Sequence, residues 1–239
     1  MPVTVAILAL NEADRIEGAL QSAAFADERL VLDAGSDDDT VELARAAGAR
    51  VLETGLPGFV AQRNRALAEA SNDRVFFLDA DERISAELAA SIQAAAGPGF
   101  RVRRQNRYLG QVVRGRFGRD RPLRLVDRRL ARCVGGAVHE QLEVQGRVAT
   151  LRGWLVHDPY RSRAEHLSTQ DRYARLFVEG ARAQGRTARW WDRMLRPTLH
   201  FVSAYLLRGG FLDGSVGLEL ALSGARHVAD KWRKLAEDA

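Results

Sequence analysis

The strongest structural signal in this chain is the stretch Val75-Phe76-Phe77-Leu78-Asp79-Ala80-Asp81-Glu82-Arg83. Its four consecutive apolar residues predict a strand that is buried on both faces, as in a parallel sheet. The apolar run stops at acids, and on an extended chain Asp79 and Asp81 project to the same side. Paired carboxylates suit a hard cation such as Mg²⁺ or Mn²⁺, which also binds phosphate. The alternative is a strand that simply runs into a polar turn, with Ser85 capping the next helix.

The first hundred residues alternate between strand and helix patterns. Buried strands are predicted at 3–10, 30–32, 50–52 and 75–78. Segments with helical spacing follow them at 12–24, 40–47, 59–70 and 85–96. Alternation at this short spacing predicts an α/β fold with a parallel, doubly wound sheet. Two of the strands end in acids, at Asp33 and at Asp79, and ligands of such sheets bind beyond the carboxyl ends of the strands.

The pattern changes after Gly97-Pro98-Gly99. Residues 100–157 contain short alternating segments broken by glycine, which predict antiparallel strands and hairpins. From Ser162 onward the chain has helical periodicity. The fold class is therefore a mostly parallel sheet, an antiparallel section and a helical tail.

The composition indicates a soluble globular protein that binds anionic partners. The 239 residues are 46% hydrophobic and 28% charged, with a net charge of +5 that is almost entirely due to arginine. The single cysteine, Cys133, rules out a disulfide within the chain and favours a reducing compartment. No stretch approaches the roughly 18 apolar residues of a membrane span, and the N-terminal run is interpreted as a strand, not a signal peptide.

Several short motifs occur in order along the chain. They are Asn11-Glu12, Asp33-Ala34-Gly35-Ser36-x-Asp38-x-Thr40, Gly58-Phe59 with Gln62-Arg63-Asn64, Asp79-Ala80-Asp81-Glu82, Val138-His139-Glu140, His157 followed by Tyr160, and Gly210-Phe211-Leu212-Asp213-Gly214. The ordered set resembles family 2 glycosyltransferases, most closely the small bacterial branch that builds lipopolysaccharide cores and similar surface glycans. Neither a Gly-x-Gly-x-x-Gly fingerprint nor a P-loop is present.

The resemblance implies a GT-A catalytic domain over residues 1–160, followed by a helical region over 161–239. Within the catalytic domain, residues 1–97 would bind the nucleotide sugar and residues 98–160 would form the acceptor side. It further implies a nucleotide-diphosphate sugar donor, usually a UDP-sugar, a divalent metal ion (Mg²⁺ or Mn²⁺), and inversion at the anomeric carbon.

Carried over to this chain, the resemblance places Asn11, Glu12 and Asp33 in the nucleoside pocket. Asp79 would contact ribose or the sugar, and Asp81 would hold the metal ion that bridges the diphosphate. The alternative for Asp33 is that it only caps the loop that follows it.

Inversion by direct displacement needs a base that removes the proton of the acceptor hydroxyl. Glu140, next to His139, is the candidate, and Glu82 and His157 are its rivals. Glu82, His157 and Tyr160 are also candidates for contacts with the acceptor or phosphates.

Arg63 lies in the first turns of a predicted helix. It is expected either to meet the phosphates or sugar of the donor, or to lie on an exposed helix face.

The helical tail combines large apolar residues between Trp190 and Leu207 with flanking arginines. The next helix, near 215–236, also has one apolar face. Such helices are typical of in-plane attachment to an anionic membrane surface. The enzyme is then expected in the cytoplasm, on the inner face of the membrane, with a glycan or lipid-linked acceptor. The alternative is a helical cap that packs on the sheet or on a second subunit; the oligomeric state stays open.

Two other functions compete with glycosyl transfer. The arginines would suit nucleic acid, but only Tyr108 and Phe117 lie between Arg101 and Arg132 as stacking platforms, so no nucleic acid is expected. A sugar-nucleotide nucleotidyltransferase would need a glycine-rich, basic first loop, and Asn11-Glu12 occupies that place.

Overall fold

The computed structural model describes all residues except 56–57, 116–118, 136–140 and 238–239. The chain divides into two compact units. We call the first, which comprises Met1–Gln105 and Arg121–His157, the sheet unit. The second, which comprises Asn106–Asp120 and Asp158–Ala239, is the helical unit.

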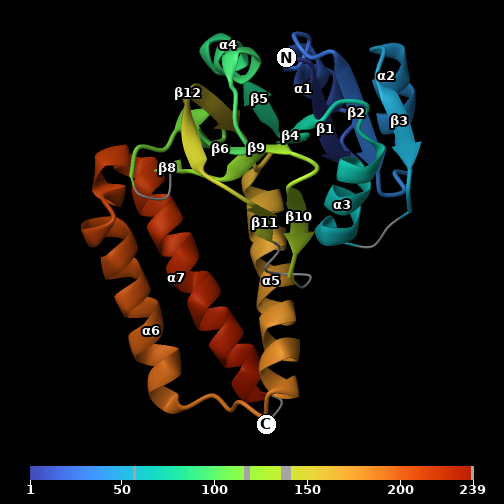
Figure 1. The fold of residues 1–239 in the computed structure, drawn as a ribbon. Coiled ribbons are helices and arrows are strands. Elements are labelled where there is room, and N and C mark those ends of the chain that lie inside the picture. The colour runs from blue at the N-terminus through green and yellow to red at the C-terminus, as the bar shows by residue number, and fades with distance from the viewer. Residues whose placement is uncertain (56–57, 116–118, 136–140, 238–239) are drawn as a thin grey trace. The chain divides into compact units, whose positions relative to one another are not determined.

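Four parallel strands form one half of the sheet, in the order β3-β2-β1-β4 (Figure 1). Their bounds are β1 (Val3–Ala9), β2 (Glu28–Asp33), β3 (Arg50–Glu53) and β4 (Arg74–Asp79). The connecting helices are α1 (Ile16–Ser22), α2 (Thr40–Ala46) and α3 (Phe59–Glu69). Ala9 pairs with Asp33 and Leu8 with Asp79, so both predicted acids end strands that flank β1.

The sheet continues beyond β4 through β9, β6, β12 and β5. Their bounds are β9 (Leu123–Asp127), β6 (Gly99–Tyr108), β12 (Val148–His157) and β5 (Glu82–Ile84), and α4 (Ala86–Ala94) follows β5. The pairs β4–β9, β9–β6 and β12–β5 are antiparallel. The short strands β7 (Gln111–Val112) and β8 (Arg119–Asp120) pair with β6, and β10 (Ala131–Val134) pairs with β11 (Gln141–Val144). The predicted fold class is confirmed.

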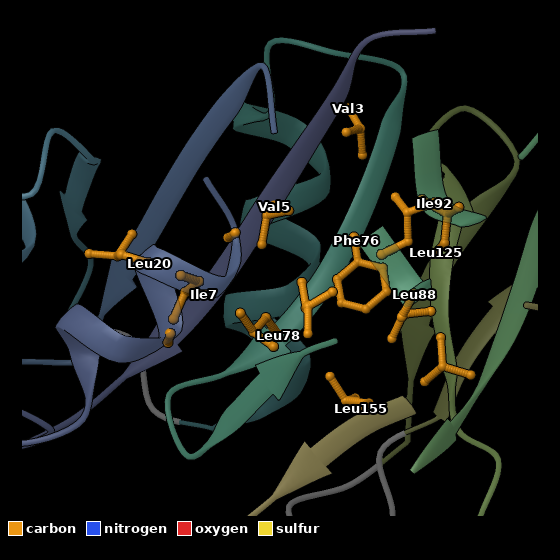
Figure 2. Packing of buried hydrophobic residues seen from close by; sticks show 14 of the residues in the cluster. Val3, Val5, Ile7, Leu20, Phe76, Leu78, Leu88, Ile92, Leu125 and Leu155 are labelled. Carbon is orange, nitrogen blue, oxygen red and sulfur yellow. The ribbon is translucent and has the colours of Figure 1, made fainter. Parts of the chain in front are cut away.

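The core lies on both faces of the parallel strands, because their side chains alternate. One face of β1 and β4 packs against α1 and α4 through Val5, Ile7, Phe76, Leu20 and Leu88 (Figure 2). The other face, which includes Leu8 and Phe77, packs against α3. Apart from Thr4 and Arg74 near their starts, these two strands are therefore apolar, and β4 ends in Asp79.

The first helix begins four residues later than predicted, at Ile16 rather than Glu12. Asn11 has a positive φ of 55°, and the backbone N–H of Glu12 donates to Thr40 Oγ1 at 2.8 Å. These residues form a loop at the carboxyl end of β1 instead of a helical turn.

The helical unit contains α5 (Arg163–Ala183), α6 (Trp190–Val202) and α7 (Gly214–Glu237). A π-helical turn over Ser203–Leu207 and a 3₁₀ turn over Gly210–Asp213 join α6 to α7. The core of this unit joins α5 to α7 through Val178, Ala181, Val228, Trp232 and Leu235. Among the helices that the structure describes, none combines the length and the apolar character that crossing a membrane requires.

Candidate active site

Acids and arginines meet at the carboxyl end of β4. Asp79 ends this strand, and Glu82, which begins β5, is fully buried. Glu82 Oε2 accepts the backbone N–H of Asp79 at 3.1 Å. Arg124, on the neighbouring strand β9, places Nη2 at 2.6 Å from both Asp79 Oδ2 and Glu82 Oε1. A second arginine, Arg104 on β6, lies 3.3 Å from Glu82 Oε1.

The pKa values of the two carboxyls shift in opposite directions. Burial alone would raise the pKa of Asp79, but the charges of Arg124 and Arg63 outweigh it and lower that pKa to about 2. Burial raises the pKa of Glu82, and the nearby charge of Asp79 adds to this effect, against Arg124. Asp79 is therefore the ionised, partly exposed group of the pair. Glu82, without exposed surface, is placed to hold arginines and not to meet an acceptor hydroxyl.

Arg63 does not lie on an exposed helix face. Its side chain is 12% exposed, and Nη2 lies 3.9 Å from Asp79 Oδ1. Its guanidinium carbon lies 5.8 Å from the centre of the Phe77 ring. The next residue of α3, Asn64, fixes this helix to β10. Its amide nitrogen donates to the Cys133 carbonyl and its amide oxygen accepts the Cys133 N–H, both at 2.9 Å. A cation is thus held next to the ionised carboxylate of Asp79.

Asp81 has a histidine as its neighbour. His157, the last residue of β12, pairs with Glu82 across the antiparallel β12–β5 ladder. That register brings His157 Nε2 to 3.3 Å from Asp81 Oδ2, with both side chains partly exposed. A carboxylate oxygen and an imidazole nitrogen are ligands that Mn²⁺ accepts, and a carboxylate also suits Mg²⁺.

This pair would hold a metal ion only together with other ligands. Outside the gaps at 56–57, 116–118, 136–140 and 238–239, no group of three or more His, Cys, Asp or Glu side chains is arranged to hold an ion. Divalent ions that bind through one or two side chains take their remaining ligands from phosphates and water. Asp81 and His157 therefore fit an ion that is bound with a phosphate-bearing substrate.

Asp33 orders its own loop. It is almost fully buried, and Oδ2 accepts the N–H groups of Gly35 and Ser36, both at 2.9 Å. Ser36 Oγ donates to Oδ1 at 2.5 Å. These contacts favour the interpretation of Asp33 as a loop cap, and its contact with a nucleoside stays a prediction.

Asn11 and Glu12 lie in a loop that is bonded to the one after β2. Asn11 donates its N–H to Ser36 Oγ at 2.9 Å, and its Oδ1 accepts the N–H of Asp37 at 3.0 Å. The N–H of Ala13 donates to Asp38 Oδ2 at 3.1 Å. The sheet thus brings Asn11, Glu12 and Asp33 together at its carboxyl edge.

The other predicted site residues lie outside the described residues or in the helical unit. His139 and Glu140 lie outside the described residues. Tyr160 belongs to the helical unit, where its ring lies 4.4 Å from that of His166 and 6.2 Å from that of Tyr108.

A cavity of about 420 Å³ lies in the helical unit and is lined by residues of α5 and α7 together with Tyr108. Four of its polar side chains bond to one another. Tyr108 donates to Glu219 at 2.9 Å and lies 3.2 Å from His166 Nδ1, while Arg163 makes two bonds to Glu219. Burial, with help from Glu219, raises the pKa of Tyr108 to about 12. The charges of Arg163 and Glu219 are therefore paired with each other.

Sequence reasoning missed Arg124 and the pairing of His157 with Asp81. Arg124 lies between Leu123 and Leu125 in a predicted strand, and a charged residue inside an apolar strand must find a buried partner. That pattern was a usable signal for Arg124. Nothing comparable marks the contact between His157 and Asp81, which depends on the register of two short strands.

Comparison with known proteins agrees with this geometry. Residues 4–138 match the family model described as "Glycosyl transferase family 2". The chain is 27% identical to the lipopolysaccharide core biosynthesis glycosyltransferase LpsC of Rhizobium meliloti (strain 1021), over 94% of this chain and 88% of that protein. It is 36% identical to an uncharacterized glycosyltransferase of Rickettsia bellii (strain RML369-C), over 47% of this chain and 37% of the relative.

Among solved structures, the chain is similar to glucosyl-3-phosphoglycerate synthase from Mycobacterium tuberculosis, crystallised with Mn²⁺ and UDP-glucose. The sequence identity is 30%, the TM-score is 0.36, and the match covers 45% of this chain and 43% of that one. The likeness is local. The family match spans more than half of the chain and confirms the resemblance seen in its motifs: this protein belongs to glycosyltransferase family 2 and is a glycosyltransferase with a GT-A fold.

Proposed function

We propose that this enzyme transfers a sugar from a UDP-sugar, with a divalent ion and with inversion, to a glycan or lipid-linked acceptor in lipopolysaccharide core synthesis. The observation that carries the donor side is the Asp81–His157 pair beside the ionised Asp79, at the carboxyl edge of the sheet. The similarity to LpsC over 94% of the chain supports the acceptor class.

On the donor side, each residue has a role that follows from its contacts. Asp79 is ionised and accepts hydrogen bonds from hydroxyls of the ribose or sugar. Arg124 fixes the orientation of Asp79 by donating from Nη2 to its Oδ2. Arg63 places positive charge next to Asp79. Asp81 and His157 would hold the ion, which when bound supplies positive charge against the diphosphate leaving group.

On the acceptor side, the acceptor oxygen forms a bond to the anomeric carbon as the bond to the UDP oxygen breaks. The hydroxyl proton must pass to a base. Glu82 is buried against Arg124 and Arg104, and His157 lies beside Asp81, so neither of these rivals is favoured. Glu140 remains our candidate for the base.

The test is the affinity for UDP, measured by titration calorimetry with and without Mn²⁺. Asp81→Asn and His157→Gln should each weaken UDP binding at least about tenfold in Mn²⁺ and leave it unchanged without the metal, because each removes one ligand. Asp73→Asn is the matched control, because it makes the same chemical change at an exposed residue outside the site, directly before β4. It should leave UDP binding unchanged. Equal affinities for wild type and Asp81→Asn in Mn²⁺ would refute the assignment.

We also propose that the enzyme works in the cytoplasm at the inner face of the membrane, where lipid-linked acceptors are found. The basic and apolar character of the C-terminal helices supports this location.

A further inference from the structure

α6 turns an apolar face away from its own unit. Most of its large apolar side chains, and those of the turns that follow it, are exposed; Trp190 is 71% exposed and Leu199 is 65% exposed. We call this set the α6 face, and it comprises Trp190, Trp191, Met194, Leu195, Leu199, Val202, Leu206, Leu207, Phe211 and Leu212. In a globular protein such a face normally covers the core.

The side of α6 that packs against α7 is polar. Asp192, Arg196 and His200 follow one another at intervals of four residues and therefore share one side of the helix. Asp192 is buried, and the Arg196 guanidinium carbon lies 4.6 Å from the centre of the Trp232 ring on α7. His200 lies so close to α7 that a Cβ on Gly224 would be 2.5 Å from its Nε2. The polar side therefore faces inward.

The core of the helical unit does not need the α6 face. Its buried apolar cluster is built from α5 and α7 within the part of the chain that the structure describes. The sequence predicted that the apolar faces of both tail helices meet a membrane, and for α7 that prediction is corrected. Ala221, Val228, Trp232 and Leu235 are buried inside the unit, whereas Leu218 and Leu222 of the predicted face are exposed and line the cavity between α5 and α7. The larger exposed apolar set is the α6 face.

The charge around the α6 face selects an anionic occupant. Between Arg186 and Leu212 the chain carries five arginines and a single acid, Asp192. That acid is buried and bonded to Arg196 at 2.5 Å. Arg193 and Arg208 are exposed, and the Arg189 guanidinium lies 5.2 Å from the Trp191 ring. A second copy that paired through the same face would bring these arginines together, which costs Coulomb energy.

We propose that the α6 face is the membrane-binding surface of this enzyme and that it lies in the plane of an anionic lipid surface. This proposal rests on the proposed function, which places the enzyme at a membrane, and adds that the α6 face makes the contact. α6 has 13 residues, so it is about 20 Å long, less than the roughly 30 Å of a hydrocarbon core. The tryptophans at its start suit the headgroup boundary, and the arginines reach the lipid phosphates.

The test is co-sedimentation of the full chain with vesicles of phosphatidylcholine that contain phosphatidylglycerol, at about 0.15 M salt. The wild type should bind these vesicles, bind pure phosphatidylcholine far more weakly, and show a blue shift of tryptophan emission on binding. Leu199→Glu should lower the partition coefficient at least about tenfold, because it removes a leucine that the membrane would bury and adds a negative charge that the anionic lipids repel. Arg193→Glu should lower it severalfold, and only on anionic vesicles.

Leu176→Glu is the matched control, since Leu176 is an exposed leucine on α5 outside the α6 face, at 43% exposure. It should bind vesicles like the wild type, and circular dichroism should show all variants folded. Equal vesicle binding by Leu199→Glu and Leu176→Glu would overturn the proposal. The proposal would also be overturned, in favour of self-association, if the wild type were a dimer that does not bind vesicles and Leu199→Glu were a monomer.

Vesicle binding needs no donor, metal ion or acceptor, so this test is separate from glycosyl transfer. A protein that binds vesicles but not UDP would contradict the proposed function alone. A protein that binds UDP in Mn²⁺ but ignores anionic vesicles would contradict the α6 proposal alone.

Discussion

Replacing Arg124 by methionine tests the ion pairs of the candidate site most directly. Arg124 is 3% exposed and joins Asp79 to Glu82, which has no exposed surface. In Arg124→Met, Glu82 keeps Arg104 at 3.3 Å, and Asp79 keeps Arg63 at 3.9 Å. Two carboxylates would then share weaker partners in a buried site. Breaking a buried ion pair from one side typically costs about 3–5 kcal/mol, so we expect a loss of that size in the free energy of unfolding.

The control for this variant is Arg129→Met. Arg129 also makes a 2.6 Å bond to an aspartate, Asp127, but its side chain is 64% exposed. Water and salt screen such a pair, so its loss should leave the free energy of unfolding nearly unchanged. The two variants share the chemical change and the bond length and differ in burial.

The assay is urea unfolding followed by circular dichroism, for both single variants, for Glu82→Gln and for the double variant Arg124→Met/Glu82→Gln. The double variant should lose less than the sum of its two single losses, because the second change removes the charge that the first left without its main partner. The reasoning fails if Arg124→Met is as stable as Arg129→Met, or if the double variant loses the full sum.

Three further predictions follow from single features. Glu140→Gln should leave UDP binding intact and lower turnover on the order of 10²-fold, which steady-state kinetics will check; activity within a few-fold of wild type would place the base elsewhere. Gly153→Ala should destabilise the protein by about 2–4 kcal/mol in urea unfolding, because φ is +87° and the new Cβ would lie 2.3 Å from the Leu88 nitrogen; wild-type stability would contradict that packing. Burial lowers the pKa of three histidines in the helical unit below 6.5: His166, His200 and His227. Below about pH 6.5 the unfolded chain then binds more protons than the folded chain, so the urea midpoint should be lower at about pH 5.5 than at about pH 8. A higher midpoint at about pH 5.5 would contradict this prediction.

The parallel half of the fold was predictable because its signals are local. Each strand is a short apolar run, and each run that ends in an acid marks the carboxyl edge of the sheet. Parallel pairing then places Asp33 and Asp79 on either side of β1 without further information. Helix ends were less predictable, since the loop that begins at Asn11 is shaped by hydrogen bonds to residues 25 and more positions away.

The antiparallel half brings together residues that no local pattern connects. Arg124 meets Asp79 from 45 positions away, and His157 meets Asp81 through the register of β12 with β5. A shift of one residue in either ladder would turn these side chains to the opposite face of the sheet. The sequence therefore predicts that acids gather at this edge of the sheet, but it does not predict that Arg124 and His157 are their partners.

The orientation of α6 shows a different limit of pattern reasoning. Helical periodicity shows that a helix has two unlike sides, but not which side its neighbours cover. Here the side that meets α7 carries Arg196, whose guanidinium carbon lies 4.6 Å from the centre of the Trp232 ring, and His200, which lies next to Gly224. Turning the apolar side inward would carry Arg196 and His200 away from α7. Because these contacts with α7 specify the rotation of α6, the exposure of its leucines is a property of the folded chain itself.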